Sequence, residues 1–374
     1  MVHTLAQIQI GQGLTIKRIN QVEPDITKDD ITAVNEYMLS GGWITENDLT
    51  RELEGKIKDF VDRKYALAVP NGTIAIYLAL LGLGIGKGKR VAVPNITMIA
   101  TINAVIWAGA EPVIVDVDNN FCLSIEKLKD LKNIDAVIFV PLNGRTGSGI
   151  EIEEWCGEKG VVLIEDSAHA LGSQYSIQRM CGKLGDASIF SFTPHKIITM
   201  GQGGIVLTDS DEVIEKIEDL KTFNRKKDAS DWHKGYGLNF KLTDLQAALG
   251  ISQFSRLLSY IENKRELLKV YNSNISEKIG EIKKFKSFET PWFFDLHLED
   301  KTKRDKVASH LKKYGISTRN SYPPLSYQEH LVTMEKTELE FSEKEGEKIL
   351  WLPSSNSLKE EDVMSITEYI NSGF

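Results

Sequence analysis

The chain has 374 residues, with 45 Lys and Arg against 53 Asp and Glu, so its formal net charge is −8. This length predicts two domains and a core that needs no disulfide or metal to stabilise it. The acidic balance and the lack of a long Lys/Arg run argue against a nucleic-acid partner, and no apolar stretch approaches the roughly 20 residues of a membrane helix.

The cysteines, the histidines and the N-terminal stretch bear on the cellular compartment. Cys122, Cys156 and Cys181 form no CxxC pair and the seven histidines are scattered, so we expect no metal site. Residues 1–20, MVHTLAQIQIGQGLTIKRIN, lack a basic start followed by an apolar block, so we expect no signal peptide. These features predict a cytoplasmic protein.

Short apolar runs alternate with helix-length stretches between residues 64 and 208. The runs are Ala66–Val69, Val91–Val93, Pro112–Val115, Ala136–Val140, Val161–Ile164, Ser188–Phe192 and Ile205–Leu207, and the stretches are Thr73–Leu83, Thr97–Ala108, Ser124–Leu131 and Ile150–Gly160. Continuous apolar runs are typical of strands covered on both faces. We therefore predict an α/β fold with a mixed, mostly parallel seven-stranded sheet, in which one of the last two strands is antiparallel.

The pattern changes after Gly237. Thr243 and Asp244 predict the N-cap and first turn of a long helix, whose apolar positions keep helical spacing through Leu268. Further predicted elements are a strand over 292–298, a helix over 301–314, a strand over 316–322 and a helix over 360–370. We predict a large α/β domain over 1–250 and a smaller C-terminal α+β domain over 251–374.

Lys196 lies in the segment FSFTPHKIITMGQGG, residues 190–204, between two predicted strands. A buried ammonium costs free energy unless it is neutralised or used. One use is a Schiff base with an aldehyde, which a desolvated lysine of lowered pKa forms readily. From this segment alone, a surface lysine on a hairpin loop fits equally well.

Asp166 ends the apolar run of the segment VVLIEDSAHALG, residues 161–172. Ligands bind at the carboxyl ends of strands in doubly wound sheets, and a carboxylate there can pair with a protonated ring nitrogen of an electron-sink cofactor. His169 can lie over or beside such a ring. In isolation, a capping role for Asp166 is the competing interpretation.

The segment VPNGTIAI, residues 69–76, runs from a strand through Asn-Gly-Thr into a helix. The amides at that helix N-terminus and the Thr73 hydroxyl form an anion site. A phosphate cradle, a carboxylate for a ring nitrogen and a Schiff-base lysine, in this order, together predict pyridoxal 5′-phosphate as the cofactor.

Six stretches also match a known family. They are SGGWITE (40–46), VPNGT (69–73), VPNITMIAT (93–101), EDSAHALGS (165–173), FSFTPHKIITMGQGG (190–204) and GLNFKLTDLQAALG (237–250). On these motifs the chain resembles, over nearly its whole length, the DegT–StrS family of sugar aminotransferases, which have the fold-type-I pyridoxal-phosphate fold. The resemblance is greatest to perosamine-synthase-like members, which aminate C4 of a 4-keto-6-deoxy nucleotide sugar.

The resemblance implies a catalytic pair. Lys196 would hold the cofactor and shuttle protons, Asp166 would bind the pyridine nitrogen, and His169 would lie beside the ring hydroxyl. The implied reaction transfers an amino group from L-glutamate to a nucleotide-linked keto sugar, in the synthesis of a perosamine- or viosamine-type sugar for a surface polysaccharide such as O-antigen.

Further residues take their roles from the same resemblance. Gly72, Thr73 and Ser191 would bind the phosphate, and Met98 stands where an aromatic residue usually covers the ring. Asn239 would reach the phosphate in the neighbouring subunit, which implies a homodimer with shared active sites. The candidates for substrate binding are Trp43, Lys241, Arg319 and Tyr322.

Two alternatives to an aminotransferase follow from the family. One subgroup replaces the lysine with histidine and dehydrates its nucleotide sugar, and His195 is adjacent to Lys196. Five residues forward from Ser191 and five back from Gly201 both reach Lys196, which favours the aminotransferase. The other alternative is a non-catalytic regulator that senses the cofactor or a sugar.

Overall fold

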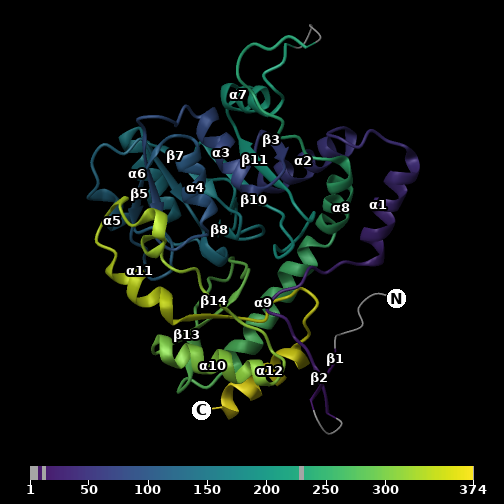
Figure 1. Ribbon diagram of the computed structural model, residues 1–374, viewed down its shortest axis with the longest axis vertical. Coiled ribbons are helices and arrows are strands. Elements are labelled where there is room, and N and C mark those ends of the chain that lie inside the picture. The colour runs from purple at the N-terminus through teal and green to yellow at the C-terminus, as the bar shows by residue number, and fades with distance from the viewer. Residues whose placement is uncertain (1–6, 11–13, 227–230, 374) are drawn as a thin grey trace.

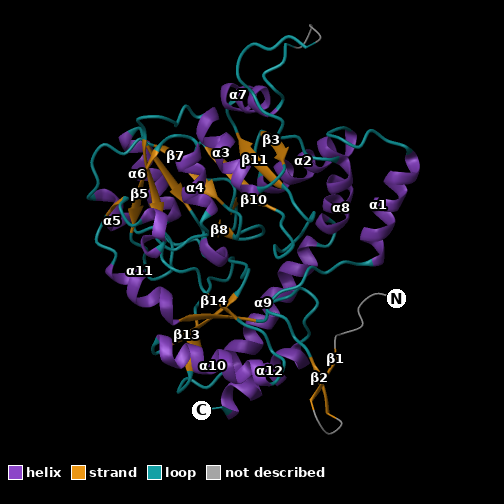
Figure 2. Ribbon diagram, in the orientation of Figure 1, coloured by secondary structure: helices purple, strands orange, loops and turns teal. Residues whose placement is uncertain are grey.

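Two separate sheets organise the chain in the computed structural model, which describes residues 7–10, 14–226 and 231–373 (Figures 1 and 2). Residues 1–6 and 11–13 of the stretch analysed for a signal peptide lie outside the described residues. No helix in these ranges combines the length and the apolarity that crossing a membrane demands.

The larger sheet has eight strands in the order β15-β5-β4-β6-β7-β10-β11-β3. Their bounds are β3 (Tyr65–Val69), β4 (Arg90–Pro94), β5 (Glu111–Val115), β6 (Ala136–Phe139), β7 (Val162–Asp166), β10 (Ala187–Ser191), β11 (Gly204–Thr208) and β15 (Glu335–Lys336). All seven predicted strands are present. β11 pairs antiparallel with both β10 and β3, whereas the other pairings are parallel, so the predicted mixed sheet is confirmed. The two-residue β15 is an eighth strand that the sequence did not indicate.

Helices cover both faces of this sheet, as the continuous apolar runs predicted. Within β4, Val91 and Val93 pack into one core cluster, whereas Ala92 between them packs into another. The covering helices are α2 (Asp48–Val61), α3 (Gly72–Gly82), α4 (Ala100–Trp107), α5 (Ile125–Lys129), α6 (Gly149–Lys159), α7 (Asp211–Lys221) and α8 (Asp244–Phe254). These helices cover the faces of the sheet and not the strand ends near α3, which form the site described below.

The smaller sheet is antiparallel, in the order β12-β13-β16-β14. Its strands are β12 (Gly280–Ile282), β13 (Phe294–Leu298), β14 (Arg319–Asn320) and β16 (Ile349–Leu352). The helices α9 (Leu257–Asn274), α10 (Lys301–Lys313) and α12 (Glu360–Ser372) supply side chains to its core. The predicted strand over 316–322 is reduced to β14.

The predicted long helix after Thr243 is two helices, α8 and α9, which are separated at Ser255 and Arg256. Thr243 is the N-cap of α8, as predicted, and forms a capping box with Gln246. Residue 250 lies inside α8, and the division into domains at that residue stays a prediction.

The remaining elements lie around the two sheets. They are the β1 (Gln7–Ile10) and β2 (Leu14–Lys17) hairpin, α1 (Lys28–Ser40), β8 (Gln174–Ser176), β9 (Arg179–Met180), α11 (Glu340–Glu345) and the 3₁₀ turns Leu142–Gly144, Leu325–Tyr327, Glu329–Leu331 and Gly346–Lys348. Residues before α1 contact the smaller sheet, because Ile19 bridges to Ile316 and Gln21 donates a hydrogen bond to the Leu352 carbonyl.

A buried ion pair joins the loop after β6 to β13. Arg145 and Asp295 are 2% and 0% exposed, and the guanidinium contacts the carboxylate directly. The Asn143 side-chain amide donates a hydrogen bond to the other carboxylate oxygen of Asp295 at 2.6 Å. Because neither charged group reaches water, the positive charge of Arg145 and the negative charge of Asp295 stabilise each other.

Asp295→Asn is expected to lower the free energy of unfolding by about 3 to 5 kcal/mol, because Arg145 would stay buried without its carboxylate. Urea denaturation followed by circular dichroism measures the change. The control is Glu212→Gln, which removes an exposed ion pair with Lys216 and should leave the midpoint nearly unchanged. Equal effects of the two substitutions would contradict the importance of the buried pair.

Candidate active site

A cavity of about 600 Å³ opens beside the N-terminus of α3, next to the carboxyl ends of β7 and β10. Eight of the residues predicted from sequence line it: Gly72, Thr73, Met98, Asp166, His169, Ser191, Lys196 and Tyr322. They come from segments that are far apart in the chain, so the fold brings together the three motifs that suggested one cofactor.

The N-terminus of α3 provides the anion site. The first four amides of a helix lack partners within it. The Asn71 side chain accepts a hydrogen bond from the Ile74 amide and the Asn71 carbonyl accepts one from the Ala75 amide, which leaves the Gly72 and Thr73 amides for a ligand. A Cβ at Gly72 would lie 2.9 Å from Cβ of Ser191, so a larger residue would close the cradle.

Lys196 lies in the loop between β10 and β11 and lines the cavity, half-buried. Its amide donates a hydrogen bond to the Thr193 carbonyl at 3.0 Å. Removal of the amino group from water lowers the pKa of Lys196 to about 7, although the Asp166 carboxylate opposes this shift. The amino group is therefore available as a neutral nucleophile near neutral pH.

Asp166 ends β7 and is 5% exposed. The Thr101 hydroxyl donates to one of its oxygens at 2.8 Å, and the Ala168 amide donates to the other at 3.3 Å. Burial raises the pKa of Asp166, whereas Thr101, Ala168 and Lys196 stabilise the ionised form. The carboxylate is held rigidly where a cationic ring nitrogen would compensate its charge.

Aromatic rings surround the lysine. The centroid of the Trp292 ring lies 4.0 Å from that of His169, with the two ring planes tilted by 31°, and the Tyr322 hydroxyl lies 3.4 Å from Nε2 of His169. Burial, aided by the charge of Lys196, lowers the pKa of His169 well below its ordinary value, so the ring is neutral. His195, beside Lys196, has its pKa lowered to about 4 mainly by burial.

Two polar atoms at the cavity fit a polar ligand. Nδ1 of His169 and Oγ1 of Thr193 are buried and have no hydrogen-bond partner within the protein. Buried polar atoms are nearly always paired, so these two indicate groups that a bound molecule would satisfy. With the free amides of α3, the lysine and the carboxylate, the residues present fit pyridoxal 5′-phosphate.

Four predicted residues do not line this cavity: Trp43, Asn239, Lys241 and Arg319. Arg319 lies close by, with its guanidinium 5.6 Å from the Tyr322 ring. The sequence analysis missed Thr101 and Trp292. Thr101 follows Met98 by about one helical turn within the quoted VPNITMIAT motif, whereas nothing in the sequence connects Trp292 with Lys196.

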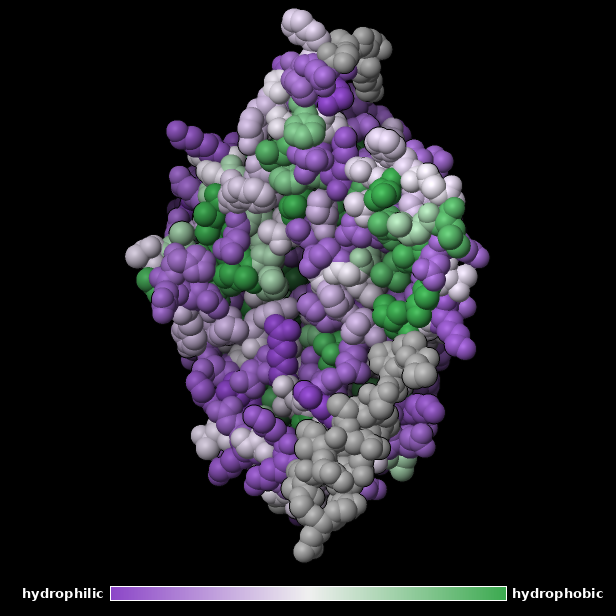
Figure 3. All heavy atoms as spheres, turned by 45° about the vertical axis from the view of Figure 1, so that its right-hand side comes forward, coloured by the Kyte–Doolittle hydropathy of each residue, from purple (hydrophilic) through white to green (hydrophobic). Residues whose placement is uncertain are grey.

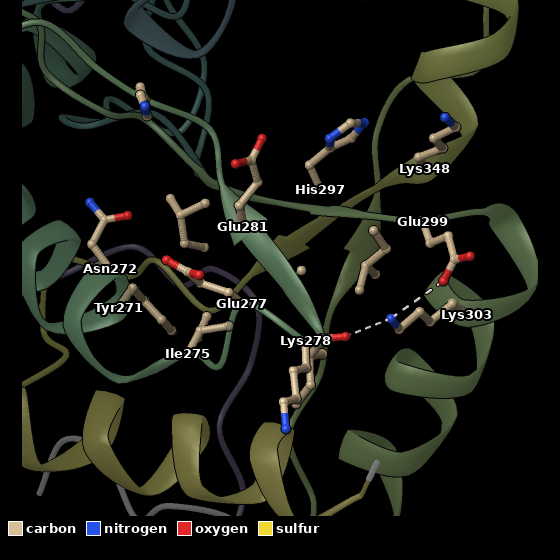
Figure 4. A pocket seen from close by; sticks show the side chains of 15 residues that line it. Tyr271, Asn272, Ile275, Glu277, Lys278, Glu281, His297, Glu299, Lys303 and Lys348 are labelled. Atoms are coloured by element: carbon tan, nitrogen blue, oxygen red, sulfur yellow. Dashed lines mark hydrogen bonds and ion pairs between the residues drawn. The ribbon is translucent and has the colours of Figure 1, made fainter.

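The other large hollow, of about 840 Å³, lies on the smaller sheet between β12 and the end of α9 (Figure 4). Its charged side chains are of both signs, and Lys303 and Lys348 pair with Glu299 and Glu345. Within the described ranges, no three His, Cys, Asp or Glu side chains group as a metal would require.

The fold and this site define a class of protein. A mostly parallel sheet, an anion-binding helix N-terminus, a buried carboxylate and a lysine of lowered pKa are the parts of a pyridoxal-phosphate-dependent aminotransferase.

Comparison with known proteins gives the family. The chain belongs to the DegT/DnrJ/EryC1/StrS aminotransferase family, whose model matches residues 24–371. GDP-perosamine synthase of Escherichia coli O157:H7 is 32% identical over 364 residues, which cover 95% of this chain and 98% of that protein. The predicted family, enzyme class and cofactor are thus confirmed.

Solved structures agree with this assignment. The aminotransferase TlmJ from Streptoalloteichus hindustanus superposes with a TM-score of 0.88 at 27% identity, over 95% of this chain and 98% of that one. DesV of S. venezuelae, solved in complex with a ketimine intermediate, gives 0.87 at 26% identity, also over 95% and 98%.

Lys196 should react with trinitrobenzenesulfonate half-maximally at about pH 7 in the cofactor-free protein, because only the neutral amine attacks and its pKa is lowered. Asp166→Asn should move this midpoint lower still, since the carboxylate raises the pKa. Peptide mass spectrometry after labelling at a series of pH values measures both. Lys269, whose pKa Glu266 raises, is the exposed control and should react only under alkaline conditions. A Lys196 midpoint as alkaline as that of Lys269 would refute the desolvated site.

Proposed function

We propose that this aminotransferase transfers the amino group of L-glutamate to a nucleotide-linked 4-keto-6-deoxy sugar. The product would be a 4-amino sugar of the perosamine or viosamine type, for a surface polysaccharide such as O-antigen. The observation that carries the reaction type is the juxtaposition of Lys196 and Asp166 at one cavity. The similarity to a GDP-perosamine synthase supports the choice of sugar.

Lys196 has two tasks in this mechanism. Its Nζ would hold the cofactor covalently, and the same amino group, once free, would accept the proton that leaves the donor α-carbon and return it to the carbon that gains it. Bound pyridoxal phosphate supplies the electron sink that makes the donor α-carbon acidic. A pKa of about 7 suits the lysine to both taking and returning a proton near neutral pH.

The neighbouring residues orient the cofactor. Asp166, anchored by Thr101, would keep the ring nitrogen protonated, and neutral His169 would contact the ring hydroxyl. The Gly72 and Thr73 amides and the Ser191 hydroxyl would bind the phosphate, and Met98 would cover the ring, since all four residues line the cavity. Each contact fixes the ring relative to Lys196, so that proton transfer occurs on one face.

The substrate-binding residues are assigned by position. Tyr322 lines the cavity, and Arg319 lies next to the Tyr322 ring. Trp43 and Lys241 belong to segments that meet, since Thr45 bridges to Thr243. We propose that these four residues bind the anionic nucleotide carrier and the sugar of the substrate.

The three free, buried cysteines agree with a cytoplasmic location for the reaction.

The working unit in this proposal is a homodimer with shared sites. Asn239 is exposed and does not line the cavity of its own chain, which agrees with a role in the neighbouring subunit. Figure 3 shows hydrophobic side chains gathered on the face that carries α1. Leu39, near the end of α1, and Trp43, just after this helix, are 87% and 72% exposed, which suits a surface that a second copy covers.

Purified protein with pyridoxal phosphate should show a visible absorption band that bleaches with L-glutamate and is absent in Lys196→Ala. The loss follows from removing the amine that holds the cofactor. Absorption spectroscopy before and after the donor measures both. A band that ignores glutamate would reject this donor and reopen the dehydratase, and no band at all would reject the cofactor.

Subunit mixing tests the shared site. Lys196→Ala and Asn239→Ala proteins are unfolded, mixed in equal amounts and refolded. If each site combines Lys196 of one chain with Asn239 of the other, one site in four is intact, so about a quarter of wild-type activity should return. No recovery above the two separate variants would place both residues in one chain, or Asn239 outside the site.

A further inference from the structure

Trp292 lies just before β13 and lines a small hollow behind Lys196, where it is 3% exposed. Its ring centroid is 4.0 Å from Nζ of Lys196 and 4.0 Å from the ring of His169. One indole therefore contacts both the catalytic lysine and the imidazole beside it.

Three hydrogen bonds hold Trp292 in place, one from its indole ring and two at its backbone. Its Nε1 donates to the His195 carbonyl at 2.7 Å, and its amide donates to the Asn143 carbonyl at 3.1 Å. Its carbonyl accepts from Nζ of Lys264 at 3.0 Å. A residue that is hydrogen-bonded at its ring, its backbone amide and its backbone carbonyl keeps its position when Lys196 moves.

Lys264 is an unusual anchor. It is 2% exposed, and its ammonium donates to the carbonyls of Trp292 and Ser354 rather than to a carboxylate. A desolvated ammonium held by two carbonyls costs free energy. These two hydrogen bonds join the backbone of Trp292 to that of Ser354 through Lys264.

The hollow behind Lys196 is small. It is lined by Lys196, His169 and Trp292, among others, and its volume of about 10 Å³ leaves room for no more than one water molecule. The space available to the amino group on this side is thus set by the indole.

We propose that Trp292 is a positioning residue for Lys196, whose amino group rests against the indole face whenever it is not joined to the cofactor. The inference rests on the proposed function for its catalytic meaning, because a free Lys196 must carry a proton between two carbons. The π face attracts the protonated amine, so it favours the form of Nζ that exists between accepting and returning that proton. Trp292 acts through Lys196 and does not itself transfer a proton.

Other charged groups also face Lys196 and set the background for this effect. The Asp166 carboxylate from the end of β7 favours the protonated amine, and Arg319 from β14 disfavours it. His169 and His195 have lowered pKa values and are neutral near pH 7. The indole is thus the contact at Nζ that attracts a cation without carrying a charge.

The test measures the pH midpoint of Lys196 labelling in the full-length, cofactor-free protein, which does not depend on transamination. Trp292→Leu removes the π face but keeps an apolar side chain, so the midpoint should fall by about half a pH unit. Trp292→Phe keeps a ring and should give an intermediate value. Trp155→Phe, on α6, is the control and should leave the midpoint unchanged.

The sign of the shift separates positioning from a purely structural role. If Trp292 only filled space, its loss would admit water and raise the midpoint, and a rise or no change overturns the proposal. Failure of the enzyme to process any keto sugar would overturn the proposed function while leaving this result intact.

A second measurement does not depend on the folding of Trp292→Leu. The indole fluorescence of the wild-type, cofactor-free protein should titrate at about pH 7, and Lys196→Met should abolish the transition. Lys264, whose pKa burial also lowers to about 7, is the competing source. A transition that survives in Lys196→Met would assign it to Lys264 and overturn the proposal.

Discussion

The structure depends on one amino group that is kept out of water. Desolvation lowers the pKa of Lys196 to about 7, while Asp166 limits the fall. Neither group is stable alone, since a buried carboxylate and a desolvated amine each cost free energy. Desolvation and the Asp166 carboxylate shift the pKa of Lys196 in opposite directions. The site is reactive because it keeps a neutral amine and a fixed negative charge within one cavity.

The rest of the fold places Lys196 and Asp166 at one cavity. The parallel strand β7 delivers Asp166 at its carboxyl end, and the antiparallel turn from β10 to β11 places Lys196 beside it. Helix α3 begins at the same edge and offers free amides for a phosphate. Segments next to the smaller sheet contribute as well, since Tyr322 lines the cavity, Trp292 lies behind Lys196, and Asp295 of β13 pairs with Arg145.

Much of this was predictable because the signals are local. Buried strands leave continuous apolar runs, and Gly72, Asp166 and Lys196 each follow a strand in a recognisable motif. β15 was not predictable, because two exposed charged residues carry no strand signal. The position of Trp292 depends on tertiary packing that its own segment does not encode. Asn239 and Lys241 stay predictions, because neither side chain lines the cavity that holds Lys196 and Asp166.

The most direct test of this account is chemical. Reduction of the cofactor-loaded protein with borohydride, followed by digestion and mass spectrometry, locates the lysine that holds pyridoxal phosphate. The account predicts the pyridoxyl group on Lys196 alone. Its attachment to Lys264, the buried lysine that shares a pKa of about 7, or to no lysine at all would contradict the assignment of the site.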